Sequence, residues 1–173
     1  MFRCFFPDEY LDSAYDIDYE KLYREGYRGL LFDIDNTLVP HGAPADKRAV
    51  ELFEKLRRIG FRSCFLSNNQ IGRVASFNDR IGEQFIENAH KPAVGGYERA
   101  MELLGTDRSN TIFIGDQLFT DIYGAKRAGI RNILVKPIHP KEEIQIVLKR
   151  YLERIVLYFY RKKMADERKE GGA

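Results

Sequence analysis

Four short segments of the chain carry acidic, hydroxyl, amide and lysine side chains, which serve in proteins as nucleophiles, metal ligands and anion-binding groups. In chain order they are Asp33-Ile34-Asp35-Asn36-Thr37, Ser67-Asn68, His90-Lys91-Pro92 and Gly115-Asp116-Gln117-Leu118-Phe119-Thr120-Asp121. Intervals of 34, 24 and 25 residues separate Asp33, Ser67, Lys91 and Asp116, and each accommodates about one helix and one strand. The first segment alone could be a turn, because Asp and Asn side chains bond nearby backbone groups. Four such segments in this order are hard to obtain by chance, which favours a shared site.

The first segment suits phosphoryl transfer from a monoester, a reaction that needs a nucleophile, neutralisation of charge and help for the leaving alkoxide. Asp33 is the predicted nucleophile and would form an aspartyl-phosphate. Asp35 returns to the same side of an extended backbone, because strand side chains alternate. There it can protonate the leaving oxygen and then deprotonate the attacking water, work worth ~10²–10⁴ in rate. A dehalogenase needs no acid at this position, so Asp35 favours a phosphatase.

A carboxylate that attacks a phosphate dianion meets like-charge repulsion, which Mg²⁺ relieves as a hard ion with oxygen ligands. Asp33 and Asp116 are the predicted carboxylate ligands of this ion. Lys91 is predicted to neutralise the phosphate and orient Asp33, although a lysine before a helix-starting proline can also be simply solvated. Asp121 holds a metal-bound water, pairs with Lys91, or is an ordinary acid in the first turn of a helix.

Hydrogen-bond donors complete the predicted phosphate site. Ser67 and the amide of Asn68 can donate to phosphate oxygens, and the alternative is that both cap a loop after a strand. His41 and His90 are near these loops and have no partner at metal-ligand spacing, so they are candidates for substrate contact only. The sequence lacks the P-loop, the dinucleotide-binding glycine motif and the nucleophile elbow of serine hydrolases.

Apolar runs alternate with helical stretches and predict the elements that must position these residues. Five strands are predicted at residues 29–33, 61–67, 84–87, 111–115 and 132–135, with helices at 45–59, 71–81, 92–104 and 120–128. Such alternation predicts an α/β fold with a five-stranded parallel sheet covered on both faces, in three layers. In an open parallel sheet the ligand crevice lies beyond the carboxyl ends of the strands, where all four polar segments are expected.

The four segments resemble the motifs of the haloacid dehalogenase-like (HAD) phosphatases. Residues 33–37 are similar to their first motif, Ser67 to the second, Lys91 to the third and residues 115–121 to the fourth, and the resemblance covers about residues 29–136. The resemblance to the bacterial YqeG group of subfamily IIIA is carried by Phe6-Pro7-Asp8-Glu9-Tyr10, Asp35-Asn36-Thr37-Leu38-Val39, Ser67-Asn68-Asn69 and Gly115-Asp116-Gln117. The family resemblance implies a Rossmann-like HAD fold, the backbone carbonyl of Asp35 as the third magnesium ligand, and supporting roles for Thr37 and Asp121.

The predicted fold leaves no room for a cap domain, which in many HAD phosphatases covers the site and selects small metabolites. A loop and a helix fill the interval between Leu38 and the second strand, and a helix and a short strand fill that between Asn68 and Lys91. An open site suits a phosphate on a large substrate such as a lipid, unless a second subunit covers it. The YqeG group resembles mitochondrial phosphatases of phosphatidylglycerophosphate, which makes a glycerophospholipid phosphate a candidate substrate. The rival interpretation is a HAD-fold binding or adaptor module with little catalysis.

The two ends of the chain are predicted to flank a catalytic core at residues 29–140. Residues 1–28 are expected as an N-terminal extension packed on that core, 141–163 as a C-terminal helix and 164–173 as a disordered tail. Residues 155–160 are all apolar or aromatic and must surround a helix, and Arg161-Lys162-Lys163 follow them. A helix that is apolar all round is buried or paired, so core packing, a homo-oligomer contact and weak contact with an anionic membrane are all open alternatives.

Composition limits the classes of partner and compartment. The 173-residue chain has a formal net charge of only +2, so no nucleic-acid partner is expected. It has no 18-residue apolar window and no secretory signal, and its two cysteines, Cys4 and Cys64, make neither a disulfide framework nor a zinc site. We therefore expect a cytoplasmic protein, or one that is peripheral at the inner face of the membrane.

Overall fold

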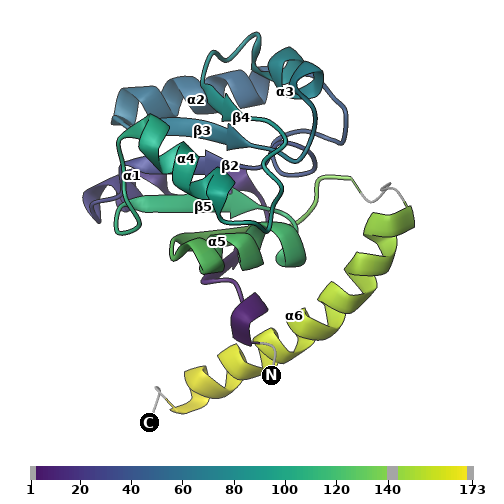
Figure 1. The fold of residues 1–173 in the computed structure, drawn as a ribbon. Coiled ribbons are helices and arrows are strands. Elements are labelled where there is room, and N and C mark those ends of the chain that lie inside the picture. Colours follow the sequence, from purple (N-terminus) through teal and green to yellow (C-terminus); the bar gives the residue numbers. More distant parts are fainter. Residues whose placement is uncertain (1–2, 140–143, 171–173) are drawn as a thin grey trace.

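A single parallel sheet lies between two layers of helices (Figure 1). The computed structural model describes residues 3–139 and 144–170, and the side chains of residues 3–139 and 151–167. The strands are β1 (Glu9–Leu11), β2 (Gly29–Phe32), β3 (Arg62–Leu66), β4 (Gln84–Ile86), β5 (Thr111–Gly115) and β6 (Arg131–Val135). Their order across the sheet is β1-β6-β5-β2-β3-β4, and every neighbouring pair is parallel. The predicted α/β class and parallel sheet are thus confirmed.

All helices but the last divide between the two faces of the sheet, and the last packs on the segment that follows β5. They are α1 (Tyr19–Arg24), α2 (Lys47–Ile59), α3 (Ile71–Asn78), α4 (Gly95–Leu104), α5 (Tyr123–Ala128) and α6 (Ile144–Glu170), with the short helical segments η1 (Arg3–Phe5), η2 (Ala14–Asp16) and η3 (Leu118–Ile122). One hydrophobic cluster joins α1, α2 and α3 to one face of the sheet, and a second joins α4 and α5 to the other face. Strand β2 is buried along its whole length, as both-sided coverage requires.

Local sequence signals explain where the helices begin and end. Asp46 caps α2 by accepting a hydrogen bond from the backbone N–H of Ala49 at 2.8 Å. Gly60 ends the same helix in the left-handed conformation, with φ of 110°, which a residue without a side chain adopts at little cost. Between these ends, Phe53 and Leu56 are buried against the sheet. The position of α2 therefore follows from its caps and its apolar stripe.

The sheet has six strands, and the prediction of five was wrong by one edge strand. Strand β1 pairs with β6, in the register Glu9 to Ile133 and Leu11 to Val135. The Asp8 carboxylate holds this pairing, because it accepts hydrogen bonds from the backbone N–H and the side-chain amide of buried Asn132, at 3.0 and 2.7 Å. A three-residue strand in an acidic stretch has no apolar run, so its pairing partner, rather than its own sequence, defines it.

Two helices differ from their predicted bounds. The helix expected at 120–128 is a π-helical turn, η3, followed directly by α5. The C-terminal helix α6 extends to Glu170, so residues 164–170 are helical where a tail was expected. The start of the predicted C-terminal helix, up to residue 143, and the last residues of the predicted tail, 171–173, lie outside the described residues.

Within residues 3–139, the connections around the sheet contain no further domain. Between β2 and β3 the chain forms a loop and α2, and between β3 and α4 it forms α3 and β4, as the prediction of an uncapped fold requires. Within the described part of the chain, no helix combines the length and the apolar character that crossing a bilayer demands.

Candidate active site

The predicted site residues come together at the carboxyl ends of the strands. Asp33 directly follows β2, Ser67 follows β3 and Asp116 follows β5, while Lys91 lies in the loop after β4. A cavity of about 250 Å³ opens there, lined by Asp33, Asp35, His41, Ser67, Asn68, Asn69, Lys91, Gln117, Thr120 and Asp121. The parallel sheet therefore brings all four polar segments to one edge, as its topology demands.

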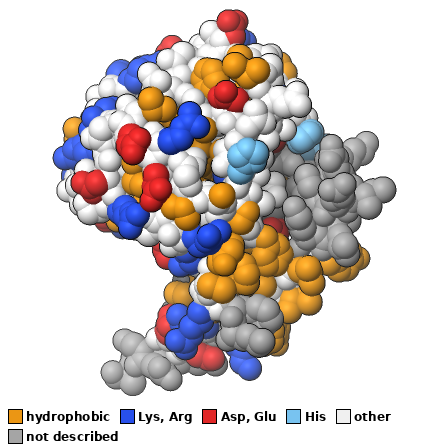
Figure 2. All heavy atoms as spheres, viewed as in Figure 1, with side chains coloured by type: hydrophobic (Ala, Val, Ile, Leu, Met, Phe, Trp, Pro, Cys, Tyr) orange, Lys and Arg blue, Asp and Glu red, His pale blue; other side chains and the backbone are white. Residues whose placement is uncertain are grey.

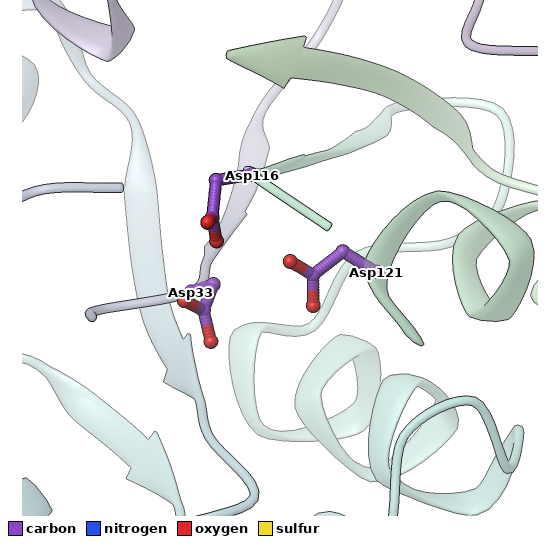
Figure 3. A group of neighbouring side chains, drawn as sticks. All are labelled: Asp33, Asp116 and Asp121. Carbon is purple, nitrogen blue, oxygen red and sulfur yellow. The ribbon is translucent and has the colours of Figure 1, made fainter. Parts of the chain in front are cut away.

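Three buried carboxylates form the centre of the site. Asp33, Asp116 and Asp121 each place an oxygen atom within 4.8 Å of the others, and their carboxylates converge on one point (Figure 3). The Lys91 ammonium donates to Asp33 Oδ1 at 2.6 Å and to Asp121 Oδ1 at 2.7 Å. Three carboxylates against one ammonium leave an excess of negative charge away from water. An all-oxygen donor set with this charge suits a hard divalent cation.

Burial and neighbouring charges shift the pKa values of this cluster. Burial raises the pKa of Asp33 to about 7, and the charge of Asp121 adds to this rise, although Lys91 opposes it. Burial by itself lowers the pKa of Lys91, but the charges of Asp121 and Asp33 outweigh burial and raise that pKa above its usual value. Lys91 therefore stays charged, and Asp33 takes up a proton more readily than an ordinary aspartate does.

The loop after β2 turns sharply so that Thr37 comes back to the carboxylates. Asn36 adopts the left-handed conformation with φ of 63°, which asparagine tolerates better than most residues. Thr37 Oγ1 then lies 3.3 Å from Asp116 Oδ1 and 3.5 Å from Asp33 Oδ2, so its hydroxyl can donate to either. The hydroxyl joins the ends of β2 and β5, which gives the predicted supporting residue a place in the cluster.

The turn after β5 holds Asp121 in place from three sides. A Cβ atom at Gly115 would lie 2.5 Å from Asp121 Oδ2, so a side chain there would displace the carboxylate. The Gln117 backbone N–H donates to Asp121 Oδ2 at 3.1 Å. Buried Tyr97, from α4, donates through its hydroxyl to the backbone carbonyls of Thr120 and Asp121, at 3.2 and 3.1 Å. In this position Asp121 pairs with Lys91 and also borders the other two carboxylates.

The Asp35 carboxylate lies in the cavity wall, apart from the three-carboxylate cluster. It accepts hydrogen bonds from Gly42 N at 2.7 Å, Asn69 Nδ2 at 2.7 Å and Arg73 Nη2 at 2.8 Å. His41 Nδ1 lies 3.9 Å from the same carboxylate. Asp35 is thus oriented by the loop that follows it and by the N-terminal part of α3.

The two predicted phosphate donors differ in what their side chains do. Asn68 clamps the main chain of Lys91, since its Oδ1 accepts from Lys91 N at 2.7 Å and its Nδ2 donates to Lys91 O at 3.0 Å. Ser67 Oγ lies in the cavity wall and accepts from Asn69 N at 3.1 Å. His90 is exposed and does not line the cavity.

Four residues around the site had no role predicted from sequence: Asn69, Arg73, Tyr97 and Glu153. Asn69 and Arg73 could have been found, because Asn69 directly follows Ser67-Asn68 and Arg73 lies in the first turn of the helix predicted at 71–81. Tyr97 and Glu153 carried no such signal. Buried Glu153, on α6, accepts a hydrogen bond from Leu118 N at 2.8 Å, at the start of η3.

Comparison with solved structures supports the HAD fold. A HAD family hydrolase from Deinococcus radiodurans superposes with a TM-score of 0.55 at 18% identity, over 72% of this chain and 87% of that one. The HAD-hydrolase YfnB from Bacillus subtilis superposes with a TM-score of 0.52 at 16% identity, over 69% and 91% of the two chains. At such identities the likeness is one of fold.

Comparison with known sequences identifies the family of this chain. The HAD-hydrolase-like family matches residues 88–143. The Bacillus subtilis protein named "Probable phosphatase YqeG" is 34% identical, over 93% of this chain and 94% of its own length. The Arabidopsis thaliana protein named "Phosphatidylglycerophosphate phosphatase 1, chloroplastic/mitochondrial" is 29% identical over 76% of this chain, which spans only 40% of that relative. The chain therefore belongs to the HAD-like hydrolases, as a phosphatase-type member of the family that includes YqeG.

Proposed function

We propose that this protein is a Mg²⁺-dependent phosphatase that hydrolyses a phosphomonoester through an aspartyl-phosphate on Asp33. The observation that carries the proposal is the buried cluster in which Lys91 bonds both Asp33 and Asp121 beside Asp116, at the wall of an open cavity. The pairing with Lys91 orients the Asp33 carboxylate, which is what a carboxylate nucleophile requires.

The reaction proceeds in two steps. An Asp33 oxygen forms a bond to phosphorus while the ester P–O bond breaks, and Asp35 gives a proton to the departing oxygen. Water then attacks the same phosphorus, Asp35 accepts its proton, and Asp33 is released together with inorganic phosphate. Asp35 must exchange one of its present hydrogen bonds, from Gly42, Asn69 or Arg73, for a contact with the leaving oxygen.

The remaining residues bind the phosphate. Lys91 balances the charge of Asp33 and the incoming phosphate, and Ser67 donates its hydroxyl to a phosphate oxygen. The side-chain amide of Asn68 is occupied with Lys91, so the phosphate contact of Asn68 falls to its backbone N–H. Asp121 is a positioning residue that acts through Lys91.

Mg²⁺, when bound, neutralises the charge between Asp33 and the phosphate dianion. Asp33 and Asp116 would hold it through carboxylate oxygens, with the backbone carbonyl of Asp35 as a third ligand. The excess negative charge of the buried cluster supports this assignment, and the related fold of YfnB was solved bound to magnesium.

We infer a lipid-like substrate, such as a glycerophospholipid phosphate, handled in the cytoplasm or at the inner face of the membrane. Two relatives are named phosphatidylglycerophosphate phosphatases, the Arabidopsis protein and one from Chlamydomonas reinhardtii that is 27% identical over 79% of this chain. The chain spans 40% and 55% of those relatives. The uncapped cavity leaves room for a phosphate carried by a large molecule.

The test is hydrolysis of an aryl phosphate with and without Mg²⁺, by the wild-type chain and by Asp33→Asn. We expect Mg²⁺-dependent turnover that Asp33→Asn lowers by at least about 10³-fold, because the nucleophile is lost. A matched panel of lipid, sugar, nucleotide and protein phosphates, compared by kcat/KM, tests the substrate class. Unchanged activity in Asp33→Asn would exclude the aspartyl-phosphate route, and no Mg²⁺-dependent turnover on any substrate would favour a binding module.

A further inference from the structure

Exposed apolar side chains concentrate on one helix of this protein. Of the eight large hydrophobic side chains that are exposed among the described residues, five lie within nine residues of α6: Tyr151, Leu152, Ile155, Tyr158 and Phe159. The other three are far apart, since Ile71 lies on α3, Leu103 on α4 and Ile138 in the loop after β6. Figure 2 shows the hydrophobic side chains gathered over the lower part of the molecule, where α6 runs. Contiguous patches of this kind mark interaction sites, whereas single exposed residues are ordinary.

The five residues form one face of the helix, which we call the outer face of α6. Their spacing of one, four, seven and eight positions after Tyr151 places them on a single stripe. The opposite face is already occupied by the core. Val156 packs there with Leu118 and Ile122 of η3, and the Tyr160 ring contacts the Phe6 ring at 5.6 Å. The outer face is therefore exposed beside the part of α6 that packs on the core.

The charges beside the outer face have one sign. Between residues 151 and 163 the only acidic residue, Glu153, is buried, whereas Arg154, Arg161 and Lys162 are exposed and Lys163 is half-exposed. Asp166 and Glu167 follow one turn further along the helix. Apolar and aromatic side chains flanked by exposed cations complement an anionic lipid surface.

A second copy of the chain fits this face less well. In a twofold dimer the same patch lies on both sides of the contact, so it would bring the cations of two outer faces together with no exposed acid between residues 151 and 163 to pair them. Like charges at such a contact oppose association. A bilayer surface supplies the opposite charge instead.

The helix that carries the outer face contacts the turn beside the candidate active site. Glu153, on the same helix, bonds Leu118 N at 2.8 Å, and Leu118 follows Gln117, which lines the cavity. A surface that touched the outer face would lie within one helix diameter of η3. That position would keep the cavity near the headgroups.

We propose that the outer face of α6 binds the surface of an anionic lipid bilayer and holds the enzyme where a lipid phosphate is presented. The inference deepens the proposed function, since it names the surface on which that substrate is met. Each basic residue near an anionic surface contributes about 1 kcal/mol, or about fivefold in partitioning. Arg154, Arg161, Lys162 and the aromatic stripe give reversible, salt-sensitive attachment, while Lys163 pairs with Glu167 at 3.3 Å.

The test is flotation of the full chain with phosphatidylcholine vesicles that contain about 40% phosphatidylglycerol, and with vesicles of phosphatidylcholine alone. Leu152→Glu is compared with Leu103→Glu, because both leucines are 53% exposed and only Leu152 lies on the outer face. We expect the wild-type chain and Leu103→Glu to float with anionic vesicles, and Leu152→Glu to bind them about tenfold less. Raising NaCl from about 0.05 M to about 0.5 M should release the wild-type chain.

The outcomes test membrane binding by the outer face separately from the proposed phosphatase activity. Absence of flotation, equal flotation of the two variants, or flotation that ignores salt and lipid charge would overturn membrane binding. A dimer in sedimentation that Leu152→Glu dissociates, without flotation, would assign the face to a second copy. Hydrolysis of a soluble aryl phosphate by the wild-type chain, without vesicles, reports the phosphatase alone, so either conclusion can fail while the other stands.

Discussion

Lys91 connects three of the polar segments of the candidate active site with its own. Its ammonium bonds Asp33 and Asp121, and it lies 5.3 Å from the centre of the Phe113 ring. Its main chain is held on both sides by the Asn68 amide. Removing one partner of a buried ion pair leaves an uncompensated charge, which typically costs about 3–5 kcal/mol. Lys91 therefore contributes both to the orientation of Asp33 and to the stability of this edge of the sheet.

At the residue scale, Asp35→Asn should separate the two chemical steps. An aryl phosphate has a good leaving group that needs no proton, so Asp33 can still be phosphorylated, whereas the water that releases the phosphate loses its base. We expect a burst of about one nitrophenol per chain, followed by turnover slowed ~10²–10⁴-fold. Rapid acid quenching measures both phases.

The control for this measurement is Asp107→Asn, which changes an exposed carboxylate outside the cavity. It should behave as the wild-type chain does. Steady-state turnover of Asp35→Asn equal to the wild type would contradict the general acid–base role. A slow reaction without a burst would show that Asp35 is needed for the first step, the phosphorylation of Asp33.

At the scale of elements, α6 is attached to the catalytic core through η3. The attachment consists of the Glu153 hydrogen bond to Leu118 N and the packing of Val156 on Leu118 and Ile122. The N-terminal segment joins the same contact, because Phe5 and Phe119 stack edge to face at 5.1 Å. Both ends of the chain therefore support the turn between Asp116 and Asp121 (Figure 1).

Replacing Glu153 should loosen this turn. In Glu153→Ala the Leu118 N–H loses its acceptor inside the protein, which we expect to lower the free energy of unfolding by about 1–3 kcal/mol. We also expect lower kcat/KM, because Asp121 lies on the same turn. Glu153→Gln keeps a carbonyl acceptor and should recover most of both quantities. Thermal denaturation and aryl phosphate kinetics measure the two effects.

Glu167→Ala provides the matched control, since Glu167 is exposed on the same helix and pairs only with nearby Lys163, at 3.3 Å, in the contacts described here. Surface pairs of this kind contribute little. Equal effects of Glu153→Ala and Glu167→Ala would show that the buried hydrogen bond does not position the turn.

At the scale of the whole molecule, metal binding should be linked to both pH and stability. Burial first, and then the charge of Asp121, raise the pKa of Asp33 to about 7, against the opposing effect of Lys91. A metal ligand must be ionised, so protons compete with Mg²⁺ below this pKa. We expect apparent Mg²⁺ affinity about tenfold weaker at pH 6 than at pH 8.

The sign follows from the raised pKa. In the metal-free protein, the folded chain binds a proton at Asp33 more tightly than the unfolded chain does. Protonation of Asp33 therefore stabilises the fold at low pH, and this contribution is lost as pH rises through about 7. Mg²⁺ should therefore raise the melting temperature more at pH 8 than at pH 6. Asp116→Asn should lose most of this shift at both pH values. Equal Mg²⁺ shifts in the wild type at the two pH values would contradict the linkage.

The sequence by itself determined the architecture and the centre of the site. Buried strands such as β2 and β5 are continuous apolar runs, and α2 carries its own caps, so local chemistry was enough to predict them. In a parallel sheet all the strands point the same way. Polar residues that follow the strands, such as Asp33 and Asp116, must then meet at one edge.

Only the tertiary structure decided which distant groups support that centre. Strand β1 exists because Asp8 bonds Asn132 across the sheet edge, and a three-residue segment carries no such information. Likewise, Asp121 bonds Lys91, and Glu153 reaches Leu118 from a helix that begins beyond the last strand. These contacts join residues far apart in the chain, and neither propensity nor periodicity records such a pairing. Packing alone brings them together, because buried polar groups must find partners wherever the fold supplies them.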